Sequence, residues 1–220
     1  ISEFSSWGPT PSLNIKPELT GHGGNILSSV TGGGYDRLSG TSMACPNLAG
    51  VVILLRQYVV ENFPDIAGDN CKVNDMVNCL LMSTADVALS TNGLPYFVRK
   101  QGAGLANLDD AASTKALILT YDRLSGAVMD KSKIELGDDP AKTGVYTLKF
   151  TIDNFGKTAL SYDISANVMT EGVSETPTYQ GETVVSEEGY LLNGAKVEIT
   201  STNGGSLKGN SVTVAAGKKC

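Results

Sequence analysis

A serine that follows a glycine and a threonine opens an apolar run in the stretch LSGTSMACPNLAG, residues 38–50. Ser42 could act as a nucleophile, because a serine hydroxyl becomes reactive once a neighbouring base takes its proton. A helix N-terminus at this point would favour the negative charge that develops during attack, and the N–H group of Ser42 could donate to it. Serines also commonly cap helices, so residue type and position alone leave both roles open.

Residues that could bind a metal ion are sparse. The four cysteines fit no zinc-ligand spacing, and one histidine adds little to them. We expect Cys45, Cys71, Cys79 and Cys220 to be free thiols, because a chain of 220 residues needs no disulfide framework. We therefore predict no metal site. No cofactor is evident, and the residues do not decide whether structural calcium binds.

The composition is that of a globular protein, with 41% hydrophobic and 18% charged residues. The net charge is −6 and neither half is basic, which argues against a nucleic-acid or anionic-membrane partner. The longest apolar run, residues 48–55, is too short to cross a bilayer, so we expect no membrane span in this segment.

Three helices are predicted in the first half of the chain. The first runs from Thr41 to about Asn62, with Ser42 or Thr41 as its cap, and ends before Pro64. It is apolar on every face, so we expect it to be buried. The second runs over residues 75–83 after an Asn74 cap, and the third lies near residues 108–115.

The periodicity changes to two beyond Leu119. Apolar and polar residues alternate in VYTLKFTI, residues 145–152, and again over residues 160–168, on both sides of the turn DNFGKTA. This pattern predicts an antiparallel hairpin. Further strands are expected at residues 182–186, 195–201 and 211–215, which together indicate a small β-sandwich.

Four motifs, in the right order, carry a resemblance to a known family. GTSMACP followed by LAG, the upstream FSSWGPT and KPELTGHGGNI, and the downstream QGAGLANLDDA resemble the subtilisin-like serine proteases. The later strands resemble the fibronectin-III-like domain of the large cell-envelope proteases of the lactocepin and C5a-peptidase type. The resemblance implies an α/β fold, the C-terminal part of a subtilisin-like parallel-sheet domain, over residues 1–118. An all-β fibronectin-III-like sandwich, incomplete at its C-terminus, would follow over residues 119–220.

The resemblance also assigns roles to individual residues. Ser42 would be the nucleophile that forms an acyl-enzyme, and its backbone N–H would donate to the oxyanion. Gly40 and Thr41 would line the substrate cleft, and residues 4–7 would lie close to the active-site wall. Three residues depart from the family pattern, namely Asn47 in place of histidine, Cys45 in place of serine or alanine, and His22 in place of proline.

The base for Ser42 is not found in this sequence. His22 lies in the segment that aligns with an Ala-Pro-Gly turn, so we expect it to face solvent rather than to act as the base. The family's Asp, His and oxyanion Asn blocks are absent. The resemblance therefore implies that these groups lie on an upstream segment, and that both ends of the chain are cut.

The leading hypothesis is a segment of a secreted serine endopeptidase, extracellular or on a bacterial cell surface. It would act on protein or peptide substrates and would need the upstream half of its catalytic domain as a partner. The isolated chain is predicted to be inactive. The alternative is a catalytically silent surface scaffold or adhesion module that retains the subtilase core.

Overall fold

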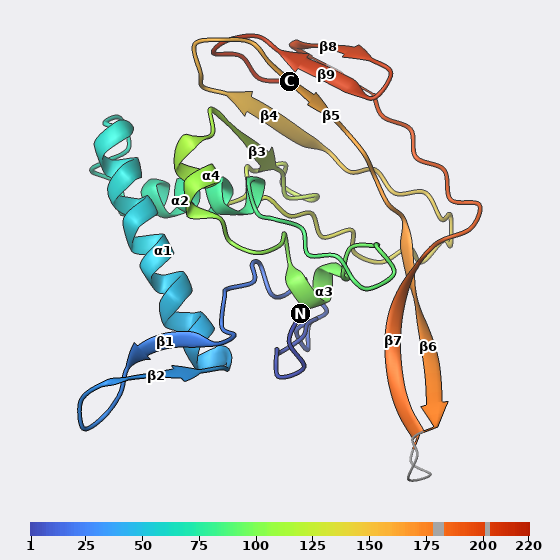
Figure 1. The fold of residues 1–220 in the computed structure, drawn as a ribbon. Coiled ribbons are helices and arrows are strands. Elements are labelled where there is room, and N and C mark those ends of the chain that lie inside the picture. Colours follow the sequence, from blue (N-terminus) through green and yellow to red (C-terminus); the bar gives the residue numbers. More distant parts are fainter. Residues whose placement is uncertain (178–182, 201–202) are drawn as a thin grey trace.

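The computed structural model describes residues 1–177, 183–200 and 203–220 (Figure 1). The first half is mainly helical, and the second half consists of strands. The first half contains β1 (Ile26–Ser29), β2 (Tyr35–Leu38), α1 (Thr41–Asn62), α2 (Asn70–Ser83), α3 (Val98–Gln101), α4 (Leu108–Ser113) and β3 (Ala116–Thr120). The second half contains β4 (Phe150–Asn154), β5 (Leu160–Asp163), β6 (Met169–Pro177), β7 (Thr183–Leu191), β8 (Gly205–Lys208) and β9 (Ser211–Val214).

The predicted bounds of the first helix are confirmed by α1, but its predicted cap is wrong. Gly40 occupies the N-cap position, and no side chain caps the helix. The carbonyl of Gly40 instead accepts the N–H groups of Met43 and Ala44. The helix ends at Phe63, whose N–H bonds the carbonyl of Val59, directly before a proline that cannot continue it. Ser42 is therefore not engaged as a capping residue.

The second predicted helix is present but begins earlier than expected. The carboxylate of Asp69 accepts the N–H groups of Cys71 and Lys72 and caps α2. Asn74 lies within α2, where its side-chain oxygen accepts a hydrogen bond from Arg56 at 2.6 Å. The helix dipole also stabilises a negatively charged cap at the N-terminus, which favours the start of α2 after Asp69. The third predicted helix is confirmed by α4.

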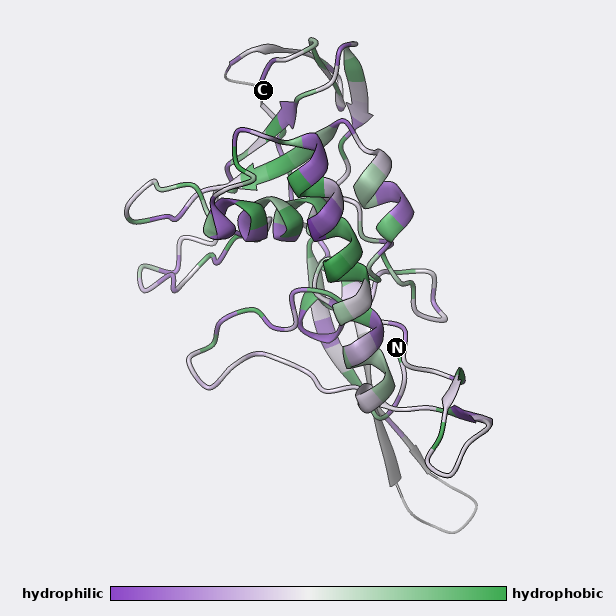
Figure 2. Cartoon of the chain, turned by 90° about the vertical axis from the view of Figure 1, so that its left-hand side faces the viewer, coloured by the Kyte–Doolittle hydropathy of each residue, from purple (hydrophilic) through white to green (hydrophobic). Residues whose placement is uncertain are grey.

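The first hydrophobic core lies between α1, α2, α4 and β3. Its buried members are Leu55, Val59, Val73, Val77, Cys79, Leu80, Leu81, Ala111 and Leu117. Only Leu55 and Val59 of α1 are buried, so the expectation that this helix is covered on all sides is wrong for this chain. Val52, Ile53, Leu54 and Val60 are exposed, and the Ile53 residue is 66% accessible. Figure 2, which views the molecule from the α1 side, shows hydrophobic stretches of α1 with no element in front of them.

Length and composition alone would allow α1 to cross a membrane, and it is the one helix in the described part of the chain that meets these criteria. Core helices of soluble proteins meet the same criteria. The apolar run considered in the sequence was shorter than this helix, which adds residues at both ends.

The predicted hairpin between residues 145–152 and 160–168 does not form. β4 begins only at Phe150 and pairs with β3 in an antiparallel register in which Ile118 lies opposite Ile152. β5 pairs instead with β9, and β9 pairs with β8. All these ladders are antiparallel. One isolated parallel bridge, between Thr20 and Leu105, is found among the described residues. Alternation thus identified the strand residues only in part, because residues 145–149 and 164–168 form no strand, and it did not identify the partners.

Asn154 explains why the chain leaves β4 without folding back onto it. Its side chain is fully buried, and its amide nitrogen donates to three backbone carbonyls, those of Thr158, Val214 and Ala215. Its side-chain oxygen accepts the N–H of Gly156. These bonds hold the turn after β4 against the end of β9, so the following strand adds to the other sheet.

A second, smaller core lies between the β3–β4 pair and the β5–β9–β8 sheet. Its buried members are Ala116, Ile152, Val212 and Val214. The strand predicted at 211–215 is confirmed by β9. Residues 183–186 of the strand predicted at 182–186 lie in β7, and residue 182 lies outside the described residues. Residues 195–200 form no strand, and residue 201 also lies outside the described residues. The fibronectin-III-like identity of this part stays a prediction.

β3 belongs to both cores, because Ala116 is buried in the second and Leu117 in the first. The boundary placed between residues 118 and 119 falls inside this strand and stays a prediction. β6 and β7 form a separate two-stranded ribbon that extends away from the rest of the chain in Figure 1.

Candidate functional site

Ser42 lies in the first turn of α1 and is exposed to solvent. Within the described residues, its hydroxyl makes no hydrogen bond, and the N–H groups of Thr41 and Ser42 have no backbone or side-chain acceptor. The first N–H groups of a helix lack intrahelical partners, and the helix dipole places partial positive charge there. This turn therefore presents a free hydroxyl beside two free donors.

The glycines of the segment GHGG hold this turn in place. The N–H of Gly40 donates to the carbonyl of Gly23 at 2.9 Å. A Cβ atom on Gly23 would lie 2.5 Å from the carbonyl oxygen of Gly40 and 2.8 Å from the Cβ of Ala44, so only glycine permits this approach. Gly40 has a φ of 156°, which side chains rarely adopt. We call residues 40–42, which contain the predicted nucleophile, the nucleophile turn, and residues 15–23, which lead to it, the strap.

The β1–β2 hairpin brings the chain back to the same turn. Ile26 pairs with Leu38 at its base. The side-chain oxygen of Ser39 accepts the N–H of Asn25 at 2.7 Å, and Arg37 donates to the carbonyl of Asn25. The residues that follow GHGG are thereby fixed relative to Gly40. The sequence did not single out these contacts; the glycine pair after His22 was the available signal.

His22 is exposed, as predicted, and forms no hydrogen bond or ion pair with a described residue. It lies next to Gly23 on the strap, but no hydrogen bond joins it to Ser42. In the ranges that the structure describes, no group of three His, Cys, Asp or Glu side chains could hold a metal ion. The structure therefore brings no base to Ser42 from these residues.

The wall segment, residues 4–7, packs against α3. The Nζ atom of Lys100 lies 3.7 Å from the centroid of the Trp7 ring, and the guanidinium of Arg99 lies 5.3 Å from it. Cations over an indole ring are favourable contacts. Arg99 also forms a two-pronged ion pair with Glu171 of β6. Thus α3, which the sequence did not predict, connects the wall segment to the β6–β7 ribbon.

No disulfide joins any of the four cysteines in the part of the chain that the structure describes, as expected. Cys45 is exposed in the same helix as Ser42, three residues further along. Cys79 is buried in the first core, and its burial raises the pKa of the thiol. A buried, protonated thiol packs as a small apolar group.

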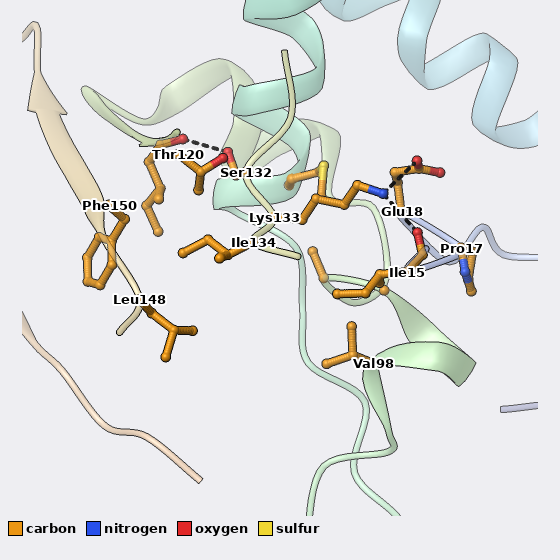
Figure 3. A pocket seen from close by; sticks show the side chains of 14 residues that line it. Ile15, Pro17, Glu18, Val98, Thr120, Ser132, Lys133, Ile134, Leu148 and Phe150 are labelled. Carbon is orange, nitrogen blue, oxygen red and sulfur yellow. Dashed lines mark hydrogen bonds and ion pairs between the residues drawn. The ribbon is translucent and has the colours of Figure 1, made fainter. Parts of the chain in front are cut away.

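An apolar cavity of about 310 Å³ lies between the strap, α3, β3 and β4 (Figure 3). Ser42 does not line it. Three polar side chains at its wall already have partners within the chain, since Thr120, Ser132 and Lys133 each donate to a backbone carbonyl. The cavity is therefore distinct from the nucleophile turn.

Residues 1–104 match the family model described as Peptidase_S8, the subtilase family. The chain is 36% identical over 129 residues to the C5a peptidase of Streptococcus pyogenes, which covers 58% of this chain and 11% of that protein. It is 30% identical over 228 aligned positions to the PI-type proteinase of Lactococcus lactis subsp. cremoris, which covers 99% of this chain and 11% of that protein. The chain thus spans about a tenth of the length of these relatives.

Among solved structures, the Clostridium perfringens CspB protease is 31% identical, with a TM-score of 0.37, over 47% of this chain and 21% of that chain. The prenylagaramide maturation protease PagA is 27% identical, with a TM-score of 0.39, over 50% of this chain and 36% of that chain. Residues 1–104 are therefore similar to the subtilase family, and the chain as a whole is similar to subtilisin-like serine proteases of the cell-envelope type.

Proposed function

We propose that this chain supplies the nucleophile of a serine endopeptidase. The observation that carries the proposal is the free state of Ser42 at the start of α1. A serine that served only as a cap would accept a backbone N–H of the first turn, and no side chain does so here. The match of residues 1–104 to the subtilase family model supports the same role.

The proposed chemistry begins with attack of the Ser42 oxygen on the carbonyl carbon of a peptide bond. The hydroxyl proton passes to a histidine base, and the carbonyl oxygen becomes negative. The unpaired N–H groups at this turn, above all that of Ser42, stabilise this oxygen. Protonation of the leaving amine then releases the first product and leaves an acyl-enzyme on Ser42, which water hydrolyses.

The base and its orienting carboxylate are proposed to lie on an upstream segment of the complete protein, together with a further oxyanion donor. No described residue replaces them at Ser42. The exposed apolar side of α1, formed by Val52, Ile53, Leu54 and Val60, is the surface where we expect that segment to pack. Gly40 and Thr41 are proposed to contact the backbone of a protein or peptide substrate. Similarity to the cell-envelope type supports a location outside the cell or on its surface.

A fluorophosphonate probe tests the proposal directly. We expect it to label Ser42 in the complete protein and not in the isolated 220-residue chain, because nucleophilicity depends on the base. Ser42→Ala should abolish labelling and peptidase activity, and Cys45→Ala serves as a neighbouring control that retains both. Equal labelling of the complete protein and the isolated chain would show that a local group activates Ser42. It would refute the proposal that the base lies on an upstream segment.

A catalytically silent scaffold or adhesion module is the second candidate. One observation favours it: the described residues bring no base within hydrogen-bonding distance of Ser42. Absence of labelling in the complete, folded protein would establish this alternative.

A further inference from the structure

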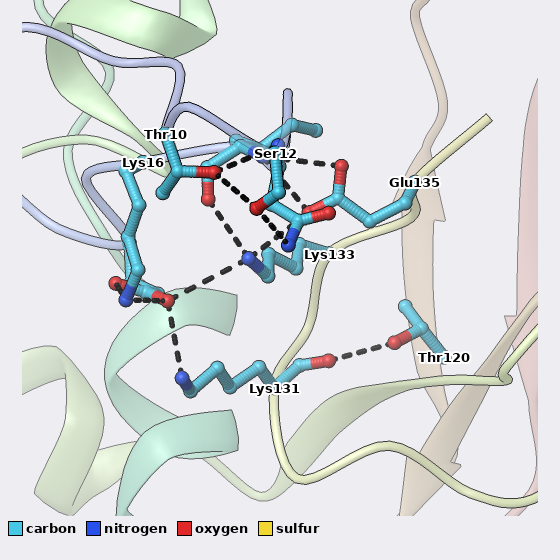
Figure 4. Close-up of polar contacts among 10 residues, drawn as sticks. Thr10, Ser12, Lys16, Thr120, Lys131, Lys133 and Glu135 are labelled. Atoms are coloured by element: carbon cyan, nitrogen blue, oxygen red, sulfur yellow. Dashed lines mark hydrogen bonds and ion pairs between the residues drawn. The ribbon is translucent and has the colours of Figure 1, made fainter. Parts of the chain in front are cut away.

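A charge cluster joins the strap to the segment that follows β3 (Figure 4). The carboxylate of Glu18 accepts hydrogen bonds from Lys16 and, at 3.1 Å, from Lys131, and Lys133 lies 3.6 Å from the same oxygen. Its side chain is only 20% exposed. Burial alone would raise the pKa of Glu18, but the hydrogen bonds and charges of Lys16 and Lys131 outweigh it and lower the pKa to about 2. Glu18 is therefore a fixed anion among three cations at neutral pH.

The partners of Glu18 are themselves tied to β3 and to the start of the strap. The carbonyl of Lys131 accepts the hydroxyl of Thr120 at 2.7 Å. Lys133 donates to the carbonyl of Ile15 at 2.8 Å, and the carboxylate of Glu135 accepts the N–H of Ile15. Residues 131–135 thus hold the start of the strap. They are themselves anchored to β3, which pairs with β4.

Beyond Glu18 the strap continues to the nucleophile turn through backbone bonds. The carbonyl of Glu18 accepts the N–H of Ala103, and the N–H of Thr20 donates to the carbonyl of Gly104. The strap then reaches Gly23, whose carbonyl holds the N–H of Gly40 two residues before Ser42. Only four residues lie between Glu18 and Gly23, so a displacement of Glu18 can be passed along this short segment to Gly23.

We propose that Glu18 is a positioning residue that couples the placement of residues 131–135 to the geometry of the Gly40–Ser42 turn. Segments on the two sides of β3 would then set the reactivity of the nucleophile together, through the strap. The alternative is that the cluster stabilises the fold without affecting the turn. The inference about reactivity rests on the proposed role of Ser42, whereas the structural coupling does not.

Amide exchange in the 220-residue chain tests the coupling without any catalysis. In Glu18→Gln the carboxylate charge is lost while the shape is kept, and we expect the Gly40 amide to exchange about tenfold faster. The amides of Leu55 and Val59 should keep their protection. The matched control is Asp153→Asn, which removes an ion pair with Lys219 at 2.7 Å that has no link to the strap. Should Glu18→Gln fail to fold, Lys131→Met, which keeps the Lys16–Glu18 pair, is expected to give the same change at Gly40.

The complete protein tests the consequence for reactivity. We expect Glu18→Gln to lower the rate of fluorophosphonate labelling at Ser42 and kcat/KM by about tenfold, because the turn that carries Ser42 and the proposed substrate contacts of Gly40 and Thr41 is displaced. Glu18→Asp should restore part of the rate. Equal Gly40 exchange in Glu18→Gln and Asp153→Asn, or a loss of rate no larger than the loss of folded protein, would overturn the inference. Failure of the proposed function itself would instead appear as no labelling of the complete wild-type protein, or as labelling that survives Ser42→Ala, with the exchange result unaffected.

Discussion

Gly23→Ala should disrupt the nucleophile turn more than any neighbouring glycine substitution. The added Cβ would lie 2.5 Å from the carbonyl oxygen of Gly40 and 2.8 Å from the Cβ of Ala44, so the strap must move away from α1. Overpacking of this kind costs about 1–3 kcal/mol, and loss of the Gly23–Gly40 hydrogen bond adds about 1 kcal/mol. We expect the free energy of unfolding to fall by about 2–4 kcal/mol.

Gly24→Ala is the matched control for this substitution. The adjacent glycine has no heavy atom within 4 Å of its would-be Cβ, so its replacement should change the free energy of unfolding by about 0.5 kcal/mol or less. Urea unfolding of the chain followed by tryptophan fluorescence gives both values, because Trp7 is the one tryptophan. Equal losses in the two variants would refute the close approach of the strap. In the complete protein, Gly23→Ala should also slow labelling of Ser42, while Gly24→Ala should not.

Three further outcomes follow from the second core, the exposed helix and the charge cluster. Asn154→Ala removes three buried donations to backbone carbonyls and should lower the free energy of unfolding by about 2–4 kcal/mol in urea, whereas Asp153→Asn should have a small effect. Ile53→Ser should reduce self-association of the isolated chain in sedimentation velocity, because it interrupts the exposed apolar side of α1, and unchanged association would show that this side is not responsible. Glu18 has a lower pKa in the folded chain than the ordinary 4.5, so it stabilises the fold above pH 4.5 and this stabilisation is lost as the pH falls towards 2. The free energy of unfolding should fall by about 1–2 kcal/mol over this range, and Glu18→Gln should flatten that part of the profile.

The sequence was most informative where local chemistry decides the structure. The bounds of α1 follow from Gly40 on one side and Phe63-Pro64 on the other, and both are properties of adjacent residues. The start of α2 was harder, because Asp69 and Asn74 are both good caps and only the folded chain shows which one bonds the free N–H groups. The motif made Ser42 a candidate nucleophile, which stays a prediction, and its free hydroxyl could be established only from the contacts around it.

Strand partners could not be predicted, because pairing depends on contacts between distant residues. The alternation on both sides of DNFGKTA is real, yet Asn154 turns the chain towards β9 through carbonyls 60 and 61 residues away. The strap was missed for the same reason, since Glu18 meets Lys131 across 113 residues. The surroundings of α1 could not be predicted either. Its apolar composition predicts that another segment covers it, but it does not predict which segment.

β3 contributes residues to both hydrophobic cores, and this limits where the polypeptide can be truncated. Neighbouring side chains of one strand, Ala116 and Leu117, fill different cores, and Thr120 anchors the segment that holds the strap. A truncation after residue 118 would remove β4, the only strand that pairs with β3 among the described residues, and would expose both cores at once. Proteases should therefore spare residues 116–120 and cut first in the exposed stretch of residues 141–149, which forms no strand. A shortened chain that keeps β3 paired with β4 must end beyond Asn154. Even then, Asn154 would lose the carbonyls of Val214 and Ala215 to which it donates.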